Sequence, residues 1–174
     1  MSQIDLSFDA LVDRYFDDTS LSGKEKPEIV VLMGTPAGGK TTIRKEKYSL
    51  GYVLVDAADI FLTMSNGEYF DFPGPFEKMM PIVGEYVADR AVKEKRHIVT
   101  EIIGSDYAPT KQLLDAMLAA GYRVNIQAID CSLETAMERN ENRGDDNVSA
   151  YYAEQYQRTW LQHAAAREVQ RRNG

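Results

Sequence analysis

The amino-acid sequence predicts an α/β fold, a three-layer sandwich in which helices cover both faces of a mostly parallel sheet. Three observations lead to this prediction: short apolar runs, longer segments of helical periodicity between them, and a glycine-rich turn directly after the first run. Strands that alternate with helices of this length are typical of βαβ units, which build parallel sheets. Ligands of such sheets bind beyond the carboxyl ends of the strands, so residues that follow a strand are candidates for function.

The predicted strands are short and apolar. The first, Ile29–Met33, is a continuous apolar run, which is typical of a strand that is buried on both faces. The remaining strands are expected at residues 52–55, 97–100 and 123–129.

The predicted helices contain apolar residues that recur every three or four positions. The first covers residues 4–17, where apolar and acidic side chains alternate at helical spacing, and a polar linker follows it. The residues from 65 to 75 are rich in glycine and proline and are expected to form a loop. We expect an N-terminal helix and linker at 1–26 and an α/β domain at 27–174. Further helices are expected at residues 41–48, in a short stretch after residue 56, and at 76–95, 110–120, 133–142 and 149–172.

The composition is that of a globular protein with an acidic balance. The 174 residues carry 27 acidic and 20 basic side chains, which gives a formal net charge of -7. A surface of this sign repels nucleic acid and anionic membranes, so we expect neither as a partner without a local basic site. No leader peptide or membrane-spanning stretch is evident, and the single cysteine, Cys131, cannot form a disulfide within the chain. We therefore expect a cytoplasmic protein.

A phosphate-binding loop follows the first predicted strand. Residues 34–41, GTPAGGKT, match the pattern G-x-x-x-x-G-K-[ST] at every fixed position. Glycines let backbone N–H groups converge on phosphate oxygens, while the lysine reaches the β- and γ-phosphates and the hydroxyl binds Mg²⁺. The alternative is a chance glycine-rich turn, but the strand before the motif and the helix after it favour a nucleotide site. The expected nucleotide-binding residues, with Lys40 also catalytic and Thr41 the metal ligand, are Gly34, Thr35, Pro36, Ala37, Gly38, Gly39, Lys40, Thr41 and Thr42.

Three acidic residues are expected at the carboxyl ends of neighbouring strands. Asp56 and Asp59 follow the second predicted strand, and Glu101 ends the third. A kinase needs a carboxylate that orients the acceptor hydroxyl and accepts its proton, and we assign this catalytic role to Asp59. Asp56 is a substrate-binding candidate whose alternative role is to cap a short helix. Glu101 is expected to bind substrate or to hold Mg²⁺ through water, with a solvated strand end as the alternative.

Two arginines at and just beyond the end of the predicted helix at 133–142 are further catalytic candidates. Arg139 and Arg143 lie four residues apart, so they share one helical face. Two guanidinium groups on one face can stabilise the charge of a transferring phosphoryl group. Gly144 follows them and would let this segment close over the site as a lid. The alternative is pairing with neighbouring glutamates on a solvated helix.

In their order along the chain these motifs resemble the zeta-toxin family of P-loop kinases. The resemblance covers roughly residues 28–145 and implies a P-loop kinase domain that phosphorylates a hydroxyl of a nucleotide-sugar or related molecule. It implies that Asp59 is the base, that the loop lysine and the arginines hold the phosphates, and that Glu101 contacts substrate or metal. It also implies an antitoxin-like protein partner. The elements that carry the resemblance are residues 34–41, Asp59-Ile60-Phe61, Glu101, and Glu138-Arg139 with Arg143-Gly144.

The leading hypothesis is a phosphotransferase that uses ATP or GTP with Mg²⁺ to phosphorylate a small molecule, such as a nucleotide-sugar or a nucleotide. A kinase of nucleic-acid 5′ ends would carry the same motifs, although the acidic balance of the chain argues against it. A third hypothesis is a non-catalytic module that binds nucleotide and is regulated by a partner docked on the N-terminal helix. The sequence lacks the N-K-x-D signal of guanine-specific GTPases, which favours a small kinase.

Overall fold

The computed structural model describes most of the chain up to Asn142. Two expected elements, the loop at 65–75 and the last helix at 149–172, lie outside the described residues. Within the part of the chain that is described, no helix is both long and apolar enough to cross a membrane. The described residues are 8–17, 19, 26–35, 37–64, 78–104 and 107–142.

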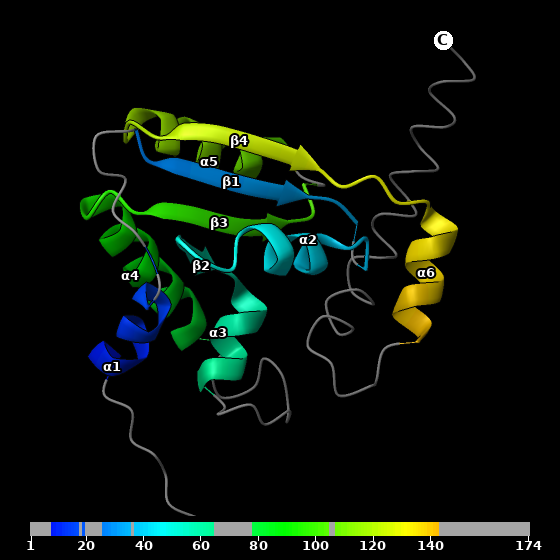
Figure 1. The fold of residues 1–174 in the computed structure, drawn as a ribbon, viewed down its shortest axis with the longest axis horizontal. Coiled ribbons are helices and arrows are strands. Elements are labelled where there is room, and N and C mark those ends of the chain that lie inside the picture. The colour runs from blue at the N-terminus through cyan, green and yellow to red at the C-terminus, as the bar shows by residue number, and fades with distance from the viewer. Residues whose placement is uncertain are drawn as a thin grey trace, which may run out of the picture.

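The fold is built on a parallel sheet with the strand order β2-β3-β1-β4 (Figure 1). β1 (Glu28–Met33) lies between β3 (His97–Ile102) and β4 (Arg123–Ala128), and β2 (Tyr52–Val55) pairs with β3. Because every pairing is parallel, the carboxyl ends of the strands lie along one edge of the sheet. The predicted α/β fold is therefore confirmed.

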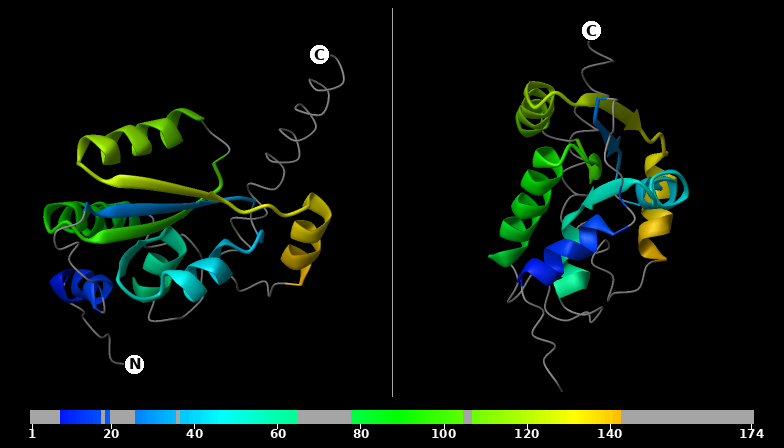
Figure 2. Two further views of the ribbon diagram at one scale, coloured as in Figure 1. Left: turned by 45° about the horizontal axis from the view of Figure 1, so that its top comes forward. Right: turned by 60° about the vertical axis from the view of Figure 1, so that its left-hand side comes forward.

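Helices cover both faces of this sheet, as the sequence predicts (Figure 2). One face packs against α4 (Met79–Lys93), α5 (Tyr107–Ala119) and the N-terminal α1 (Phe8–Asp13). The other face packs against α2 (Lys40–Lys47), which follows β1. The arrangement is the three-layer sandwich of P-loop kinase-like folds.

Two further helices extend from the carboxyl edge of the sheet. α3 (Ala57–Met64) follows β2 and packs against α4. α6 (Leu133–Glu141) follows β4 and lies beyond the ends of the strands (Figure 1). Both helices therefore stand at the edge where the sequence predicts the functional residues.

The inner strand β1 buries both of its faces. Ile29 and Val31 pack on the side of α4, where Val87 is fully buried with them. Val30 faces the opposite layer and packs in a separate cluster with Ile43 of α2. Burial of a side chain of this size contributes roughly 1.5 to 3 kcal/mol, so β1 anchors both helical layers.

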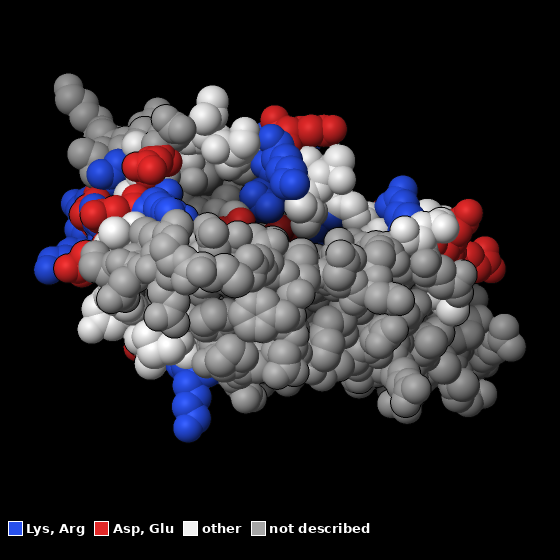
Figure 3. Space-filling view, turned by 90° about the horizontal axis from the view of Figure 1, so that it is seen from below, with Lys and Arg blue, Asp and Glu red and all other residues white. Residues whose placement is uncertain are grey.

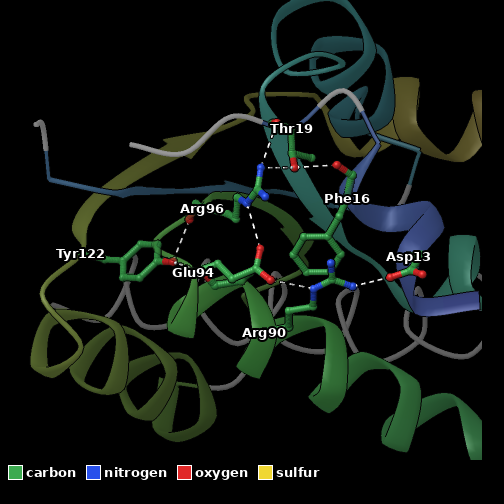
Figure 4. Close-up of polar contacts among 8 residues, drawn as sticks. Asp13, Phe16, Thr19, Arg90, Glu94, Arg96 and Tyr122 are labelled. Carbon is green, nitrogen blue, oxygen red and sulfur yellow. Dashed lines mark hydrogen bonds and ion pairs between the residues drawn. The ribbon is translucent and has the colours of Figure 1, made fainter. Parts of the chain in front are cut away.

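The N-terminal segment, residues 8–17 together with Thr19, is attached to α4 by apolar and charged contacts (Figure 4). α1 is followed directly by a short 3₁₀ helix, η1 (Arg14–Phe16). The guanidinium carbon of Arg90 lies 4.1 Å from the ring centre of Phe16, and Arg90 donates a hydrogen bond to Asp13 Oδ1 at 2.6 Å. Four residues of this segment are buried in the same core cluster as the sheet and α4, namely Leu11, Val12, Tyr15 and Phe16.

The turn between α4 and β3 provides a second attachment for this segment (Figure 4). Arg96 donates to the carbonyl oxygen of Thr19 at 3.0 Å, and Glu94 accepts from both Arg90 at 2.9 Å and Arg96 at 3.1 Å. The Tyr122 hydroxyl in turn donates to the carbonyl oxygen of Arg96 at 2.7 Å. Partly exposed ion pairs contribute little energy individually, but this network fixes the path of the chain over α4.

Several element boundaries differ from the prediction by one or more residues, including those of β3, α5 and the N-terminal helix. β3 continues to Ile102 because its last two residues still pair with β1. α5 begins at Tyr107, before Pro109, because a proline is tolerated in the first turn of a helix, where its missing N–H would have no partner. The N-terminal helix ends at Asp13, and the last residues of the expected helix form η1 instead.

Two glycines with positive φ, Gly104 after β3 and Gly121 before β4, differ in how closely other atoms approach them. Gly104 has φ +72°, and a Cβ added there would lie 2.6 Å from Met33 Cγ. Gly121 has φ +87°, but no other atom would lie within 4 Å of a Cβ added there. We expect Gly104→Ala to lower the free energy of unfolding by about 2 to 3 kcal/mol and Gly121→Ala by about 1 kcal/mol, because only the first adds steric overlap to backbone strain. Urea unfolding measures both losses, and equal losses would contradict the close approach.

Candidate active site

The predicted site residues that the structure describes gather at the carboxyl edge of the sheet. β1 leads into the phosphate-binding loop and α2, and β2 leads into α3, which begins next to Asp56 and carries Asp59. Glu101 is the penultimate residue of β3, and Arg139 lies on α6. Figure 3 shows lysine and arginine side chains gathered over α2, with acidic side chains recessed behind them.

The phosphate-binding loop is folded tightly against the ends of the strands. The N–H of Gly34 donates to the carbonyl oxygen of Ile102 at 3.1 Å, and that of Gly38 donates to Thr35 O at 3.0 Å. A Cβ on Gly34 would lie 3.0 Å from the carbonyl oxygen of Ile129, and a Cβ on Gly38 would lie 2.9 Å from Thr35 O. The loop can take this path only because both positions lack a side chain.

Lys40 begins α2 and lies over the loop. Gly39 before it has φ +103°, a left-handed conformation that glycine adopts without strain. The Lys40 ammonium donates to the carbonyl oxygens of Gly34 at 2.6 Å and Thr35 at 3.2 Å. These contacts hold a positive charge at the N-terminal end of an eight-residue helix, which is the arrangement that suits a bound phosphate.

Glu101 connects the loop to β3. Its Oε1 accepts a hydrogen bond from the Thr41 hydroxyl at 2.8 Å, and its Oε2 accepts from Arg44 Nε at 3.0 Å. The Glu101 side chain is only 8% exposed and that of Arg44 only 13%, so this ion pair is screened little by solvent. Glu101 is therefore held in place by two partners, and the alternative of a solvated strand end is wrong.

Asp56 caps α3, which is the alternative role predicted for it from the sequence. Its Oδ2 accepts a hydrogen bond from the backbone N–H of Asp59 at 3.0 Å. Burial raises the pKa of Asp56 to about 6, and the nearby negative charge of Glu101 adds to this effect. The positive charge of Arg44 acts in the opposite direction. Two acidic side chains are thus kept close together beside the phosphate-binding loop.

Asp59 lies in the first turn of α3, next to Asp56 and close to a tyrosine of the N-terminal segment. Its side chain is half-buried. The Asp59 carboxylate lies near enough to Tyr15 to raise the pKa of that phenol, an effect that adds to the larger one of burial. Asp59 therefore lies between Asp56 and the N-terminal segment.

Arg139 lies against the phosphate-binding loop. One guanidinium nitrogen is 3.7 Å from the position that a Cβ on Gly39 would take, and it approaches Cys131 Sγ at 3.8 Å. The Cys131 Cβ itself lies 3.7 Å from the Cβ position of Gly38. Arg143 and Pro36 lie outside the described residues, so the expected pair of arginines is represented by Arg139 alone.

The donor atoms beside the loop fit a magnesium ion bound together with a nucleotide. Thr41 and Glu101 bring a hydroxyl and a carboxylate into contact at 2.8 Å, and oxygen ligands are those that Mg²⁺ prefers. Among the described residues no three acidic, histidine or cysteine side chains converge as a metal site of their own. Mg²⁺ usually binds through one or two protein oxygens together with phosphates and water.

Two residues that contact the site, Arg44 and Tyr15, have no role predicted from the sequence. Arg44 was visible as part of a basic cluster, and its position four residues after Lys40 places both on one side of α2. Tyr15 gave no such signal, because its contact with α3 spans 48 residues and depends on the packing of the N-terminal segment.

Asp56→Asn tests the buried carboxylate. Because the pKa of Asp56 is raised to about 6, the folded state binds the proton more tightly than the unfolded chain does. The wild type should therefore lose on the order of 2 kcal/mol of stability as the pH rises from about 4 to about 6. Asparagine keeps a cap for α3 without the charge, so the variant should lack this loss and be the more stable protein above pH 6. Urea unfolding with a chelator across this pH range measures the slope, which Asp115→Asn on the exposed face of α5 should leave unchanged.

Comparison with known proteins supports the fold at low sequence identity. Neither a protein-family model nor a curated protein matches the chain. Among solved structures, it is similar to a chain of the PezAT chromosomal toxin–antitoxin system of Streptococcus pneumoniae, with a TM-score of 0.57 and 16% identity over 80% of this chain and 65% of that one. It is also similar to a chain of the AvrRxo1-ORF1:AvrRxo1-ORF2 complex with ATP, with a TM-score of 0.61 and 15% identity over 80% of this chain and 50% of that one.

A third similar structure is a chain of the Pnkp1/Rnl/Hen1 complex, with a TM-score of 0.52 and 18% identity over 71% of this chain and 41% of that one. The chain thus spans between 41% and 65% of the length of these three structures. The zeta-toxin resemblance inferred from the motifs is confirmed at the level of the fold, which is the P-loop kinase-like α/β fold.

Proposed function

We propose that this chain is a kinase that transfers the γ-phosphate of ATP or GTP to a hydroxyl group of a small molecule. The observation that carries the proposal is the contact of Thr41 with Glu101 at the phosphate-binding loop, with Asp59 on the adjacent helix. A nucleotide-binding loop alone would serve many functions. Phosphoryl transfer also requires a carboxylate that accepts the proton of the acceptor hydroxyl beside the γ-phosphate, and Asp59 would supply it.

The proposed reaction is an in-line displacement at the γ-phosphorus. The oxygen of the acceptor hydroxyl forms a bond to the γ-phosphorus as the bond from that phosphorus to the β–γ bridging oxygen breaks, and the nucleoside diphosphate leaves. Asp59 orients the hydroxyl and takes its proton. Lys40 and Arg139 hold the negative charge that spreads over the phosphoryl oxygens in the transition state.

Thr41 and Glu101 would hold Mg²⁺, Thr41 directly and Glu101 through water. When bound, the ion neutralises negative charge on the β- and γ-phosphates. Arg44 holds the Glu101 carboxylate oriented toward α2, since its Nε lies 3.0 Å from Glu101 Oε2.

The acceptor is proposed to be a nucleotide-sugar or a nucleotide, in line with the resemblance to zeta toxins. A nucleic-acid 5′ end is the second candidate, because the fold is also similar to a chain of the Pnkp1/Rnl/Hen1 RNA repair complex, with a TM-score of 0.52. The net charge of -7 favours the small molecule, since a polynucleotide would be repelled outside a local basic site.

A protein partner is also proposed. Two of the similar structures are described as a toxin–antitoxin system and as a complex of two open reading frames. An antitoxin-like partner of this chain would be expected to cover the phosphate-binding loop or the N-terminal segment.

Lys40→Ala tests the nucleotide side of the site. We expect phosphoryl transfer from γ-labelled ATP to fall by at least about 100-fold, because the variant loses the cation that contacts the β- and γ-phosphates. Lys111→Ala is the matched control, since Lys111 pairs with Asp115 on the exposed face of α5 and should leave transfer unchanged. Normal transfer by Lys40→Ala would place the nucleotide elsewhere.

Asp59→Asn separates catalysis from binding. The proposal predicts that nucleotide affinity stays within about twofold of wild type while kcat falls by about 100-fold or more, because only proton acceptance is lost. The assay follows γ-phosphate transfer into a pool of cell metabolites, with nucleotide-sugars and oligonucleotides tested separately. Tight nucleotide binding with no product in any pool would favour the nucleotide-gated module, and labelled oligonucleotides alone would favour the 5′-end kinase.

A further inference from the structure

We propose that the N-terminal segment contributes to phosphoryl transfer through Tyr15. Tyr15 is a positioning residue that holds the first turn of α3, and with it Asp59, in place. The inference deepens the proposed function and rests on it, because it assigns Asp59 its orientation. It also gives the N-terminal segment a role in transfer beyond that of a partner-binding helix.

The contact between Tyr15 and α3 is direct. The Tyr15 hydroxyl donates a hydrogen bond to Thr63 Oγ1 at 3.1 Å, and the Thr63 hydroxyl donates to the carbonyl oxygen of Asp59 at 2.9 Å. Asp59 and Thr63 are four residues apart on the helix, so they lie on the same face one turn apart. A single side chain from outside α3 thus reaches the turn that carries the proposed base.

The Tyr15 hydroxyl is kept protonated and is therefore a permanent donor. Tyr15 is 8% exposed and belongs to the core cluster that also contains Ile60 of α3. Burial raises the pKa of Tyr15 far above its usual range, and the carboxylates of Asp59 and Asp56 add to the rise. Because its single proton is donated to Thr63, Tyr15 acts on Asp59 through the Thr63 hydroxyl and the backbone of the first turn of α3.

The segment itself is fixed on both sides of Tyr15 (Figure 4). Asp13 before it is bound to Arg90 at 2.6 Å, and Phe16 after it lies under the same guanidinium at 4.1 Å. Thr19 is bound further along by Arg96 at 3.0 Å. These contacts hold the backbone on both sides of Tyr15, and so they place its hydroxyl beside Thr63 and the first turn of α3.

Tyr15→Phe tests the proposal with a matched control. The variant keeps the buried ring and loses only the hydroxyl, so we expect kcat to fall about tenfold while the nucleotide Kd and KM stay at their wild-type values. Tyr52→Phe also removes a partly buried phenol hydroxyl, one that donates to Glu28 Oε2 at 2.8 Å at the amino end of the sheet, away from the site. The control should lose stability and keep kcat. Equal kcat values for both variants would overturn the proposal, because they would show that the loss of any such phenol hydroxyl changes kcat to the same extent.

A double-mutant cycle shows whether Tyr15 acts through Asp59. In the Asp59→Ala background, Tyr15→Phe should produce no further loss of kcat, whereas an independent role would give a second loss of about tenfold. Thr63→Val, which removes the bridging hydroxyl, should reproduce part of the loss seen with Tyr15→Phe. A second tenfold loss in the Asp59→Ala background would overturn the assignment.

A second cycle, Tyr15→Phe with Thr63→Val in urea unfolding, needs no catalytic activity. Because the two hydroxyls are in direct contact, the two substitutions should be coupled by about fivefold in the unfolding equilibrium constant, as expected for one hydrogen bond. If this coupling is found but the wild type phosphorylates no acceptor, the proposed function is rejected and the structural contact of Tyr15 still stands. Coupling below about twofold would reject the positioning role whatever the activity.

Discussion

The parallel pairing of β1 with β3 is the constraint on which the site depends. Its register sets Leu32 beside Glu101, so the end of β3 lies next to the loop that leaves β1. The Thr41 hydroxyl can reach the Glu101 carboxylate only in this register, because a shift of one residue would turn Glu101 to the other face of the sheet. The buried apolar side chains of β1 hold that register, and so the core of the fold and the chemistry of its edge are fixed together.

The acidic side chains at this edge lower the stability of the folded protein. Asp56 and Glu101 are close enough to disfavour ionisation of Asp56, and Arg44 relieves only part of that repulsion. Removing carboxylates from water is unfavourable unless each is hydrogen-bonded, and both are: Asp56 by the α3 backbone, Glu101 by Thr41 and Arg44. Such a cluster is typical of a site in which charge serves a reaction rather than the fold.

The sequence was sufficient for features that depend on local spacing. The loop, the alternation of strands and helices, and the positions of Asp56 and Glu101 at strand ends follow from periodicity and turn chemistry, and the structure confirms these placements. Contacts between distant segments were not accessible in this way. The ion pair of Arg44 with Glu101 and the contact of Tyr15 with α3 join residues 57 and 48 positions apart, and no periodic pattern encodes such separations. They become visible only once the sheet order and the path of the N-terminal segment are known.

The place of Cys131 has a practical consequence. It is the only cysteine of the chain, and its Sγ lies 3.8 Å from a guanidinium nitrogen of Arg139. It also lies close to the phosphate-binding loop, because a methyl group added to Gly38 would be 3.7 Å from the Cys131 Cβ. A small thiol-directed fluorophore would therefore attach at one defined point, with no background from other thiols. The natural chain thus already carries a single labelling position beside the phosphate-binding loop, suited to following events at that loop by fluorescence.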